Sequence, residues 1–338
     1  MDPIVIDGSK GEGGGQILRT ALALSCITGI PFNIKNIRAK RPKPGLQPQH
    51  LTSTNSLSLI TKAEVDGNKV GSTDLFFKPN RIIGGYYEFD IGTAGSIPLL
   101  MQSVLPVMLY ADRPSKINMT GGTHVSHSPS TDYFENIFLP MIRKMGVNAE
   151  ILVEEFGWYP KGQGKVTLFV KPSIISPISI TEKLNLKSIN GVISQSNLPD
   201  EIMEREEQSI RSIFPGIILT KRNRNSASAG NAITTWAEYE NTIIGSGILG
   251  EKGIKAEKIA KTCAEELNKL VKSKGAVDQW MGDQILIYMA LACGESKIKV
   301  NKITGHMRSC MEIIPLFTGK QFNIEGKIIS IEGIGKSK

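Results

Sequence analysis

His306 is the residue of this sequence best placed to act as a nucleophile. The chain has only four histidines, and this one closes a β-like run, 297–306, directly before an apolar, helix-forming stretch, 307–317. Backbone N–H groups at the start of a helix favour anions. An imidazole displayed there can attack a phosphorus centre. A structural or acid–base histidine is the alternative that position alone leaves open.

A glycine-rich loop near the N-terminus is a second candidate site. Residues 8–15 contain five glycines between a strand-like run and a helix-forming run. Such a turn can bind an anion through its N–H groups, although its spacing matches neither standard nucleotide-binding motif. Glu12, the one acid of the loop, is a candidate Mg²⁺ ligand, and Arg19 could contact the same anion. A tight structural turn with a solvated Glu12 is the alternative.

The next loop along the chain is short, proline-rich and strongly basic. It carries Arg38, Arg41 and two lysines, and residues 36–63 contain no Asp or Glu. Gln49 and His50 open the helix that follows. A stiff cationic loop beside a helix start suits a terminal phosphate, with the arginines making bidentate contacts. A solubilising surface loop is the alternative.

Three further groups of polar residues are candidates for lining a cleft. Residues 280–284 place an aromatic ring beside an acid and an amide, which suits a nucleoside, although a helix cap with a core tryptophan would give the same pattern. Gln102, inside an apolar helix, is either a pocket contact or a satisfied buried amide. His124 and His127 lack an evident third metal ligand, so we expect a polar loop lining a cleft. The first group comprises Trp280, Met281, Gly282, Asp283 and Gln284.

The elements that must position these residues recur three times along the chain. In each segment a helix is followed by a strand, a loop with unusual residues and a second helix. Glycines at helix ends and alternation in the strands favour this assignment. Recurring units of this kind predict an α/β (α+β) fold in which repeated βα units form one large domain. The first helices fall at 16–28, 97–111 and 283–292, and the second helices at 48–62, 132–145 and 307–317.

The pattern changes over residues 181–276. There an acidic helix begins around Asp200, and after further β-like runs a long amphipathic helix covers 254–272. At 338 residues the chain is also long for a single core. We therefore expect a smaller α/β domain inserted in the third repeat, and a catalytic domain built from residues 1–180 and 277–338.

Composition narrows the classes of partner. The net charge of +8 suits a polyanion. The longest apolar stretch is interrupted by prolines and too short to span a bilayer, and no signal peptide is evident, so we expect a cytoplasmic protein with no membrane partner. The sequence leaves open whether the protein forms a homo-oligomer. The cysteines show no C-x-x-C spacing, so we expect no zinc site. We expect four buried thiols: Cys26, Cys263, Cys293 and Cys310.

Taken together, these segments resemble the RNA 3′-terminal phosphate cyclases over essentially the whole chain. The resemblance rests on four blocks, 7–19, 37–46, 157–164 and 304–306. It implies ATP-dependent conversion of an RNA 3′-terminal phosphate to a 2′,3′-cyclic phosphate. His306 would carry AMP covalently, AMP would pass to the RNA 3′-phosphate end, and the neighbouring 2′-OH would expel it.

The resemblance also implies roles for the other candidates. Glu12 would bind Mg²⁺ or Mn²⁺, and ATP would contact Gln102 and residues 280–284. The phosphates and the RNA would contact Arg19, Arg38, Arg41, Gln49 and His50.

Two alternatives to a cyclase remain. A non-catalytic relative acting in ribosomal RNA processing is expected to lack the histidine at position 306. An enolpyruvyl transferase has a related repeated fold, but the basic proline-rich loop and Gly305-His306 fit it poorly.

Overall fold

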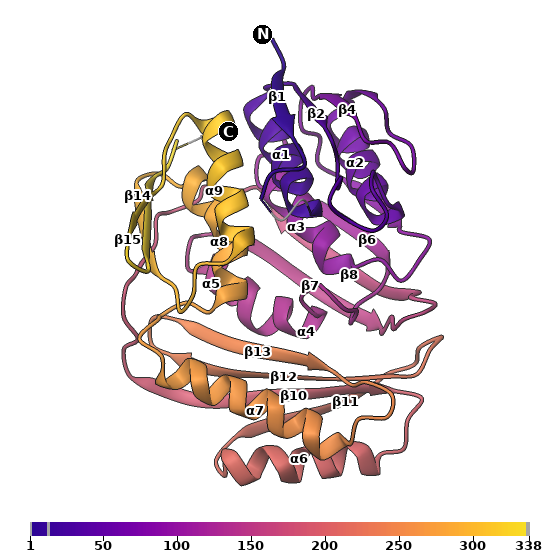
Figure 1. Cartoon of the computed structure of the whole chain (residues 1–338), viewed down its shortest axis with the longest axis vertical. Helices are drawn as coiled ribbons and strands as arrows, with labels where there is room; N and C mark the ends of the chain where they lie inside the picture. The colour runs from indigo at the N-terminus through magenta and orange to yellow at the C-terminus, as the bar shows by residue number, and fades with distance from the viewer. Residues whose placement is uncertain (1, 12–13, 336–338) are drawn as a thin grey trace.

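The computed structural model describes residues 2–11 and 14–335, and within these ranges the strands form four sheets of four strands each. Three sheets belong to repeated units, and the fourth lies below them in Figure 1. The predicted α+β class is therefore confirmed. No helix in the described part of the chain combines the length and the apolar character needed to cross a membrane.

Each repeated unit has the element order β-α-β-α-β-β. Its first two strands are parallel, and its last two strands pair antiparallel with each other, the final one also lying antiparallel to the second. The first unit consists of β1 (Ile4–Asp7), α1 (Gly15–Thr28), β2 (Phe32–Lys35), α2 (Pro48–Thr61), β3 (Glu64–Asp66) and β4 (Leu75–Lys78). The second consists of β5 (Tyr86–Asp90), α3 (Ile97–Met108), β6 (Ser115–Gly121), a helix with a central π segment formed by α4 (Thr131–Tyr133), η1 (Phe134–Phe138) and α5 (Leu139–Arg143), β7 (Asn148–Glu155) and β8 (Gly164–Lys171). The third consists of β9 (Ser179–Ile180), α8 (Gln279–Leu291), β14 (Glu295–Lys299), α9 (Gly305–Thr318), β15 (Asn323–Glu325) and β16 (Ile328–Glu332).

A fourth unit interrupts the third repeat between β9 and α8. Two helices cover one face of its sheet, and the other face is turned toward the repeats (Figure 1). Its helix-covered face has an apolar core of its own, which includes Ile193, Ile210 and Ile233. Whether this unit is an independent domain stays a prediction. Its elements are β10 (Leu186–Ser196), α6 (Glu201–Ile213), β11 (Ile218–Asn223), β12 (Gly230–Tyr239), β13 (Ile243–Leu249) and α7 (Ala256–Lys272).

Four helices join the three repeats. Helix α1 contacts α3 and α9, and α8 contacts both of these, so the four form a closed ring between the sheets (Figure 1). Helix α1 is buried on every side from Ile17 to Ile27. Polar residues inside this ring, Arg19 among them, are therefore removed from solvent and need a specific reason to be there.

Two expectations from the sequence are corrected. The strand expected to run to His306 ends at Lys299. The hydroxyl of Thr304 accepts a hydrogen bond from the Met307 N–H at 3.0 Å and caps α9. His306 therefore lies inside the first helical turn. The expectation of four buried thiols is wrong for Cys293, which is exposed after the end of α8, although all four cysteines are free.

Glu206 of α6 gives the fourth unit a pH-dependent stability. Burial raises the pKa of this carboxyl to about 7, against the opposing effect of the hydrogen bond from Asn231 at 2.9 Å. In an unfolded chain the pKa of a glutamate is about 4.3. The folded state therefore binds the proton more tightly, and stability falls as pH rises from about 4 to about 7.

Glu206→Gln should consequently stabilise the protein at about pH 8, by at most about 4 kcal/mol, and leave its stability unchanged at about pH 4. Glutamine keeps an acceptor for Asn231 and carries no charge into the core. Thermal unfolding of both proteins at the two pH values measures the effect. A change in melting temperature of the same size at both values would contradict the assignment.

Candidate active site

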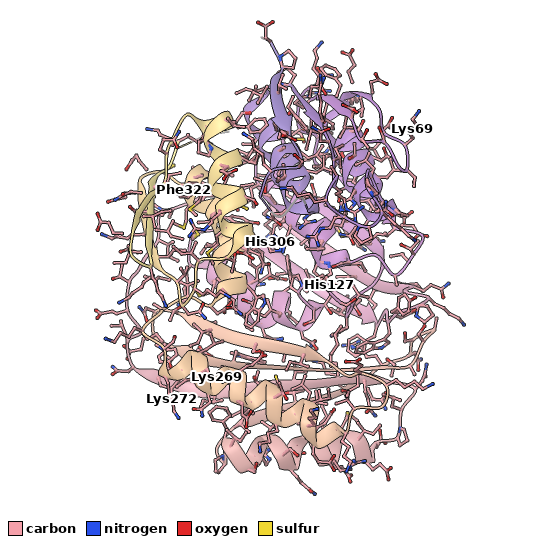
Figure 2. All side chains as sticks on the ribbon, viewed as in Figure 1. Lys69, His127, Lys269, Lys272, His306 and Phe322 are labelled. Carbon is pink, nitrogen blue, oxygen red and sulfur yellow. The ribbon has the colours of Figure 1, made fainter. Side chains whose placement is uncertain are left out.

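A cleft of about 840 Å³ lies where the three repeats meet the fourth unit. It gathers most of the residues predicted from the sequence, although they come from loops far apart in the chain. Figure 2 shows His306 and His127 in the interior between the units, whereas Lys269 and Lys272 lie on helix α7, away from the cleft. The predicted residues that line the cleft are Arg19, Arg38, Arg41, Gln49, His50, Gln102, Trp280, Asp283, Gln284 and His306.

Two predicted residues that the structure describes, Met281 and Gly282, do not line this cleft. Met281 is fully buried in the core. Gly282 allows close packing of α8 on α9, since a Cβ there would lie 2.2 Å from the terminal methyl carbon of Met307. Glu12 lies outside the described residues, so its role as a metal ligand stays a prediction.

His306 lies in the first turn of α9 and lines the cleft. The capping residue Thr304 also donates a hydrogen bond to Asp283 of α8. This contact ties the starts of two helices together, so the position of His306 relative to α8 is fixed. A negatively charged group beside His306 would be stabilised by the N-terminus of α9.

Arg19 is the cation most deeply buried in the cleft wall, with 8% of its surface exposed. Its Nη2 donates to Gln16 Oε1 at 2.7 Å, its Nε has no partner, and no carboxylate of the described residues pairs with it. Burial lowers the pKa of this guanidinium to about 10, so it stays charged at neutral pH. A buried cation without a carboxylate partner is arranged to receive an anion.

His50 lies beside Arg19 as a neutral hydrogen-bond donor. Its Nδ1 accepts the Gln47 N–H at 3.2 Å in a capping box at the start of α2. Burial, together with the charges of Arg19 and Arg38, lowers the pKa of the imidazole to about 3. The neutral ring therefore carries its proton on Nε2, the atom directed toward Gly15. An anion at this site would meet a donor rather than a second fixed positive charge.

Two amide side chains and an indole ring, carried by α3 and α8, line another part of the cleft. Gln102 Nε2 donates to Gln284 Oε1 at 2.9 Å, and Gln284 Nε2 donates to the Trp280 carbonyl at 2.8 Å. Gln102 is therefore both a cleft residue and a satisfied amide. The Trp280 ring meets Tyr133 edge to face, with ring centroids 6.4 Å apart. This combination suits a flat, polar-edged ligand.

Sequence reasoning missed the anchor of this wall, Asp278. Its carboxylate accepts from the N–H groups of Trp280 and Met281, from the Tyr133 hydroxyl at 2.7 Å and from the Gly245 N–H of β13 at 3.0 Å. Burial raises its pKa to about 6, although each of these donors acts in the opposite direction. An aspartate just before a helix can be recognised in the sequence as a helix cap. Its contacts with the second repeat and the fourth unit cannot be predicted from the neighbouring sequence.

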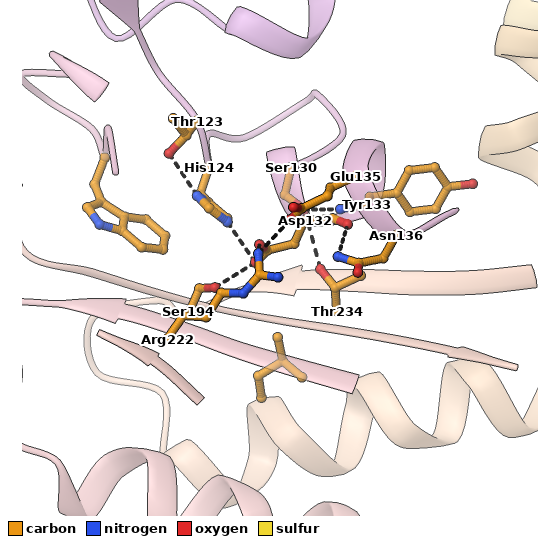
Figure 3. A network of polar contacts seen from close by, with 12 residues as sticks. Thr123, His124, Ser130, Asp132, Tyr133, Glu135, Asn136, Ser194, Arg222 and Thr234 are labelled. Carbon is orange, nitrogen blue, oxygen red and sulfur yellow. Dashed lines mark hydrogen bonds and ion pairs between the residues drawn. The ribbon is translucent and has the colours of Figure 1, made fainter. Parts of the chain in front are cut away.

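A buried ionic network fixes the neighbouring wall to the fourth unit (Figure 3). Asp132 Oδ2 accepts from His124 Nε2 at 2.9 Å and from Ser194 Oγ of β10 at 2.7 Å. Arg222 of β11 donates to Asp132 at 3.3 Å and to Glu135 at 2.6 Å. Burial alone would raise the pKa of Asp132, but the histidine, the serine and the arginine together lower it. The fourth unit is thereby held against the second repeat.

The two histidines of this wall have different environments. His124 is buried in the network and does not line the cleft, whereas His127 is exposed on it. No group of three His, Cys, Asp or Glu side chains in the described ranges could hold a metal ion. Asp283 brings a carboxylate to the cleft surface, and magnesium bound chiefly through phosphates needs only one or two such ligands.

Comparison with known proteins gives one consistent family. The family model of RNA 3′-terminal phosphate cyclase matches residues 10–324. A protein of that name from Pyrococcus furiosus is 42% identical over 330 residues, covering 96% of each chain. Its namesake from Archaeoglobus fulgidus is 41% identical, covering 97% of this chain and 100% of its own. Another, from Thermococcus gammatolerans, is 42% identical, covering 97% and 96%.

Among solved structures, the enolpyruvyl transferase NikO from Streptomyces tendae matches with a TM-score of 0.40 and 8% identity. The match covers 98% of this chain and 48% of that one. A likeness at this level carries no argument about activity.

Proposed function

The chain belongs to the RNA 3′-terminal phosphate cyclase family, and from this premise we propose that it uses ATP to convert an RNA 3′-terminal phosphate to a 2′,3′-cyclic phosphate. One observation supports the proposal best. A single cleft brings the nucleophile candidate His306, at a helix start, together with the buried Arg19 guanidinium, which pairs with no carboxylate in the part of the chain that the structure describes.

In the proposed first step, a neutral ring nitrogen of His306 attacks the α-phosphorus of ATP. A P–N bond forms, the bond to the bridging oxygen breaks, and pyrophosphate leaves. The N-terminus of α9 and the cations of the cleft would offset the negative charge that develops. His306 is the described cleft residue whose chemistry and position fit this role.

Two further displacements complete the reaction. An oxygen of the RNA 3′-phosphate attacks the same phosphorus, the P–N bond breaks, and the imidazole is restored. The adjacent 2′-OH then attacks the RNA phosphorus, loses its proton and expels AMP, which closes the cyclic phosphate. Because each step is a displacement at phosphorus, positioning and charge neutralisation should supply most of the catalysis.

The cleft divides naturally between the two substrates. Gln102, Trp280 and the polar residues of α8 would hold the nucleoside of ATP. The phosphates would contact the cationic side, which comprises Arg19, Arg38, Arg41, Gln49 and His50. Mg²⁺ or Mn²⁺ would neutralise phosphate charge when bound, and Glu12 remains the proposed ligand, with Asp283 as the carboxylate on the cleft surface.

Cyclisation of a 3′-phosphorylated oligoribonucleotide tests the proposal. With ATP and Mg²⁺, the terminal phosphate should become resistant to phosphatase, and one AMP and one pyrophosphate should appear for each end converted. Binding of the RNA without any product would favour the non-catalytic ribosomal RNA processing factor. A product that requires phosphoenolpyruvate would favour the enolpyruvyl transferase.

Gly15→Ala should lower cyclisation about 100-fold, the scale expected when catalytic groups are misplaced by about 1 Å. A Cβ at this position would lie 2.3 Å from His50 Nε2 and 2.9 Å from Arg19 Nη1, so both side chains must move. The measurement is kcat/KM for cyclisation, together with the melting temperature.

Gly216→Ala is the matched control, because a Cβ there meets no atom within 4 Å. It should change neither the rate nor the melting temperature. An active Gly15→Ala protein would show that the close approach of His50 and Arg19 to the glycine loop is not needed for catalysis.

A further inference from the structure

Tyr159 is an exposed aromatic side chain at the rim of the cleft. It lines the cleft, yet 79% of its surface is accessible to solvent, the largest exposed fraction among the exposed large apolar and aromatic side chains of the described residues. A ring in this position contributes little to the folded core. Its exposure therefore calls for an explanation outside folding.

The loop that carries Tyr159 is held firmly on both sides. The indole Nε1 of Trp158 donates to Ser196 Oγ of the fourth unit at 2.9 Å, and the indole stacks on the buried His124 with centroids 4.6 Å apart. The Gly162 N–H donates to the Trp158 carbonyl at 2.8 Å and closes the turn. The ring is thus presented to solvent by a fixed backbone.

Two exposed cations belong to this loop and to the segment joined to it. The backbone N–H of Lys161 donates to Ser228 Oγ at 3.4 Å, which joins the Tyr159 loop to the β11–β12 connection. That connection carries Arg224, whose guanidinium lies 5.7 Å from the centre of the Phe156 ring. Neither Lys161 nor Arg224 forms an ion pair with a carboxylate of the described residues. Tyr159, Lys161 and Arg224 are called the Tyr159 ridge below.

We propose that the Tyr159 ridge binds the single-stranded body of the RNA just upstream of its 3′ end. One base stacks on Tyr159, and phosphates of the adjoining nucleotides contact Lys161 and Arg224. Proteins that bind single strands combine aromatic stacking with a cationic track in this way. The inference rests on the proposed function, since an RNA end held in the cleft must leave it across the rim.

The geometry also gives the fourth unit a role. Arg224 and Ser228 belong to this unit, and its Ser196 anchors Trp158. The ridge exists because the fourth unit is docked against the second repeat. An RNA with two features, a terminal phosphate and a flexible single-stranded body, would therefore contact both the repeats and the fourth unit.

Binding of two RNAs separates stacking from charge. Both carry a 3′-phosphate and about ten nucleotides, within the span of one single-strand site; in one of them the nucleotides upstream of the terminal one lack bases. Dissociation constants are measured by fluorescence anisotropy without ATP, over a series of salt concentrations. The wild-type protein should bind the complete RNA about tenfold more tightly than the abasic one.

Tyr159→Ala should remove that difference, and Tyr159→Phe should keep it, because stacking needs the ring and not the hydroxyl. The double variant Lys161→Ala/Arg224→Ala should weaken binding of both RNAs and reduce the slope of log Kd against log salt by about 1.4. The matched control Lys269→Ala/Lys272→Ala removes two charges from α7 and should leave the slope unchanged.

An undiminished preference for the complete RNA in Tyr159→Ala, or an unchanged slope in the ridge double variant, would overturn the inference. Labelling of the protein by ATP alone and cyclisation are measured on the same proteins. Wild-type protein that binds RNA as described but forms no cyclic product would refute the proposed function and leave the ridge standing. Loss of ATP labelling in Tyr159→Ala would assign the ring to ATP and overturn the inference.

Discussion

Replacing His306 by alanine is expected to abolish the covalent protein–AMP adduct and to lower cyclisation on the order of 10⁴-fold or more, as removal of a nucleophile does in other covalent mechanisms. The fold should survive, because the helix cap is provided by Thr304 and the side chain of His306 is only half-buried. The loss would then belong to chemistry and not to stability.

Incubation with α-labelled ATP and Mg²⁺, followed by a denaturing gel, measures the adduct. A phosphoramidate on histidine should be labile in acid and stable in alkali. His127→Ala is the matched control, since this exposed histidine lies in the same cleft and should keep the label. A label that persists in His306→Ala would place the nucleophile elsewhere, and an unlabelled wild-type protein would favour the RNA-binding processing factor.

The sequence predicts those parts of the site whose structure depends on residues close together in the chain. The glycine loop, the basic loop and Gly305-His306 each combine a special backbone position with charged or nucleophilic side chains. The second helix of each repeat falls close to its predicted range, and two of the ends carry a local signal: Pro48 begins α2, and Gly319 follows the end of α9. The cleft gathers these loops because the repeats share one topology, so corresponding loops come to the same side.

The parts that the sequence does not predict depend on contacts between units. The Tyr133 hydroxyl and the Gly245 N–H reach Asp278 from different units, and no spacing in the chain announces either contact. His124 and His127 are three residues apart and look alike in sequence, yet Asp132 buries one of them in its network. Hydrophobic periodicity also cannot show that Gly282 serves helix packing rather than the cleft.

These contacts give the cleft a mixed origin. Its cationic side belongs to the first repeat and its helix-start side to the third, and strands β12 and β13 of the fourth unit also line it. The buried network at Asp132 and the anchor at Asp278 both reach the fourth unit, the first at β10 and the second at β13. A change in the docking of that unit would therefore be transmitted to the wall that carries Trp280.

Arg19→Met is expected to lower the rate of cyclisation about 10³-fold. It should also raise the free energy of unfolding of the ligand-free protein by about 1–3 kcal/mol, because burying an unpaired charge destabilises a fold more than burying an apolar side chain of similar volume. Burial lowers the pKa of Arg19 to about 10. A cation whose folded pKa lies below its unfolded value costs stability at every pH below the folded pKa. The variant should therefore be more stable throughout the neutral range.

Unfolding is measured without ligand and again with inorganic phosphate. Phosphate should raise the melting temperature of the wild-type protein and leave that of Arg19→Met unchanged, since binding to the native state alone stabilises it. Arg143→Met is the matched control: Arg143 is exposed, outside the cleft, and donates twice to the Ala149 carbonyl, so its loss should not stabilise the protein. A lower melting temperature in Arg19→Met would instead make Arg19 a structural support of α1, and the anion site would have to be sought at Arg38 and Arg41.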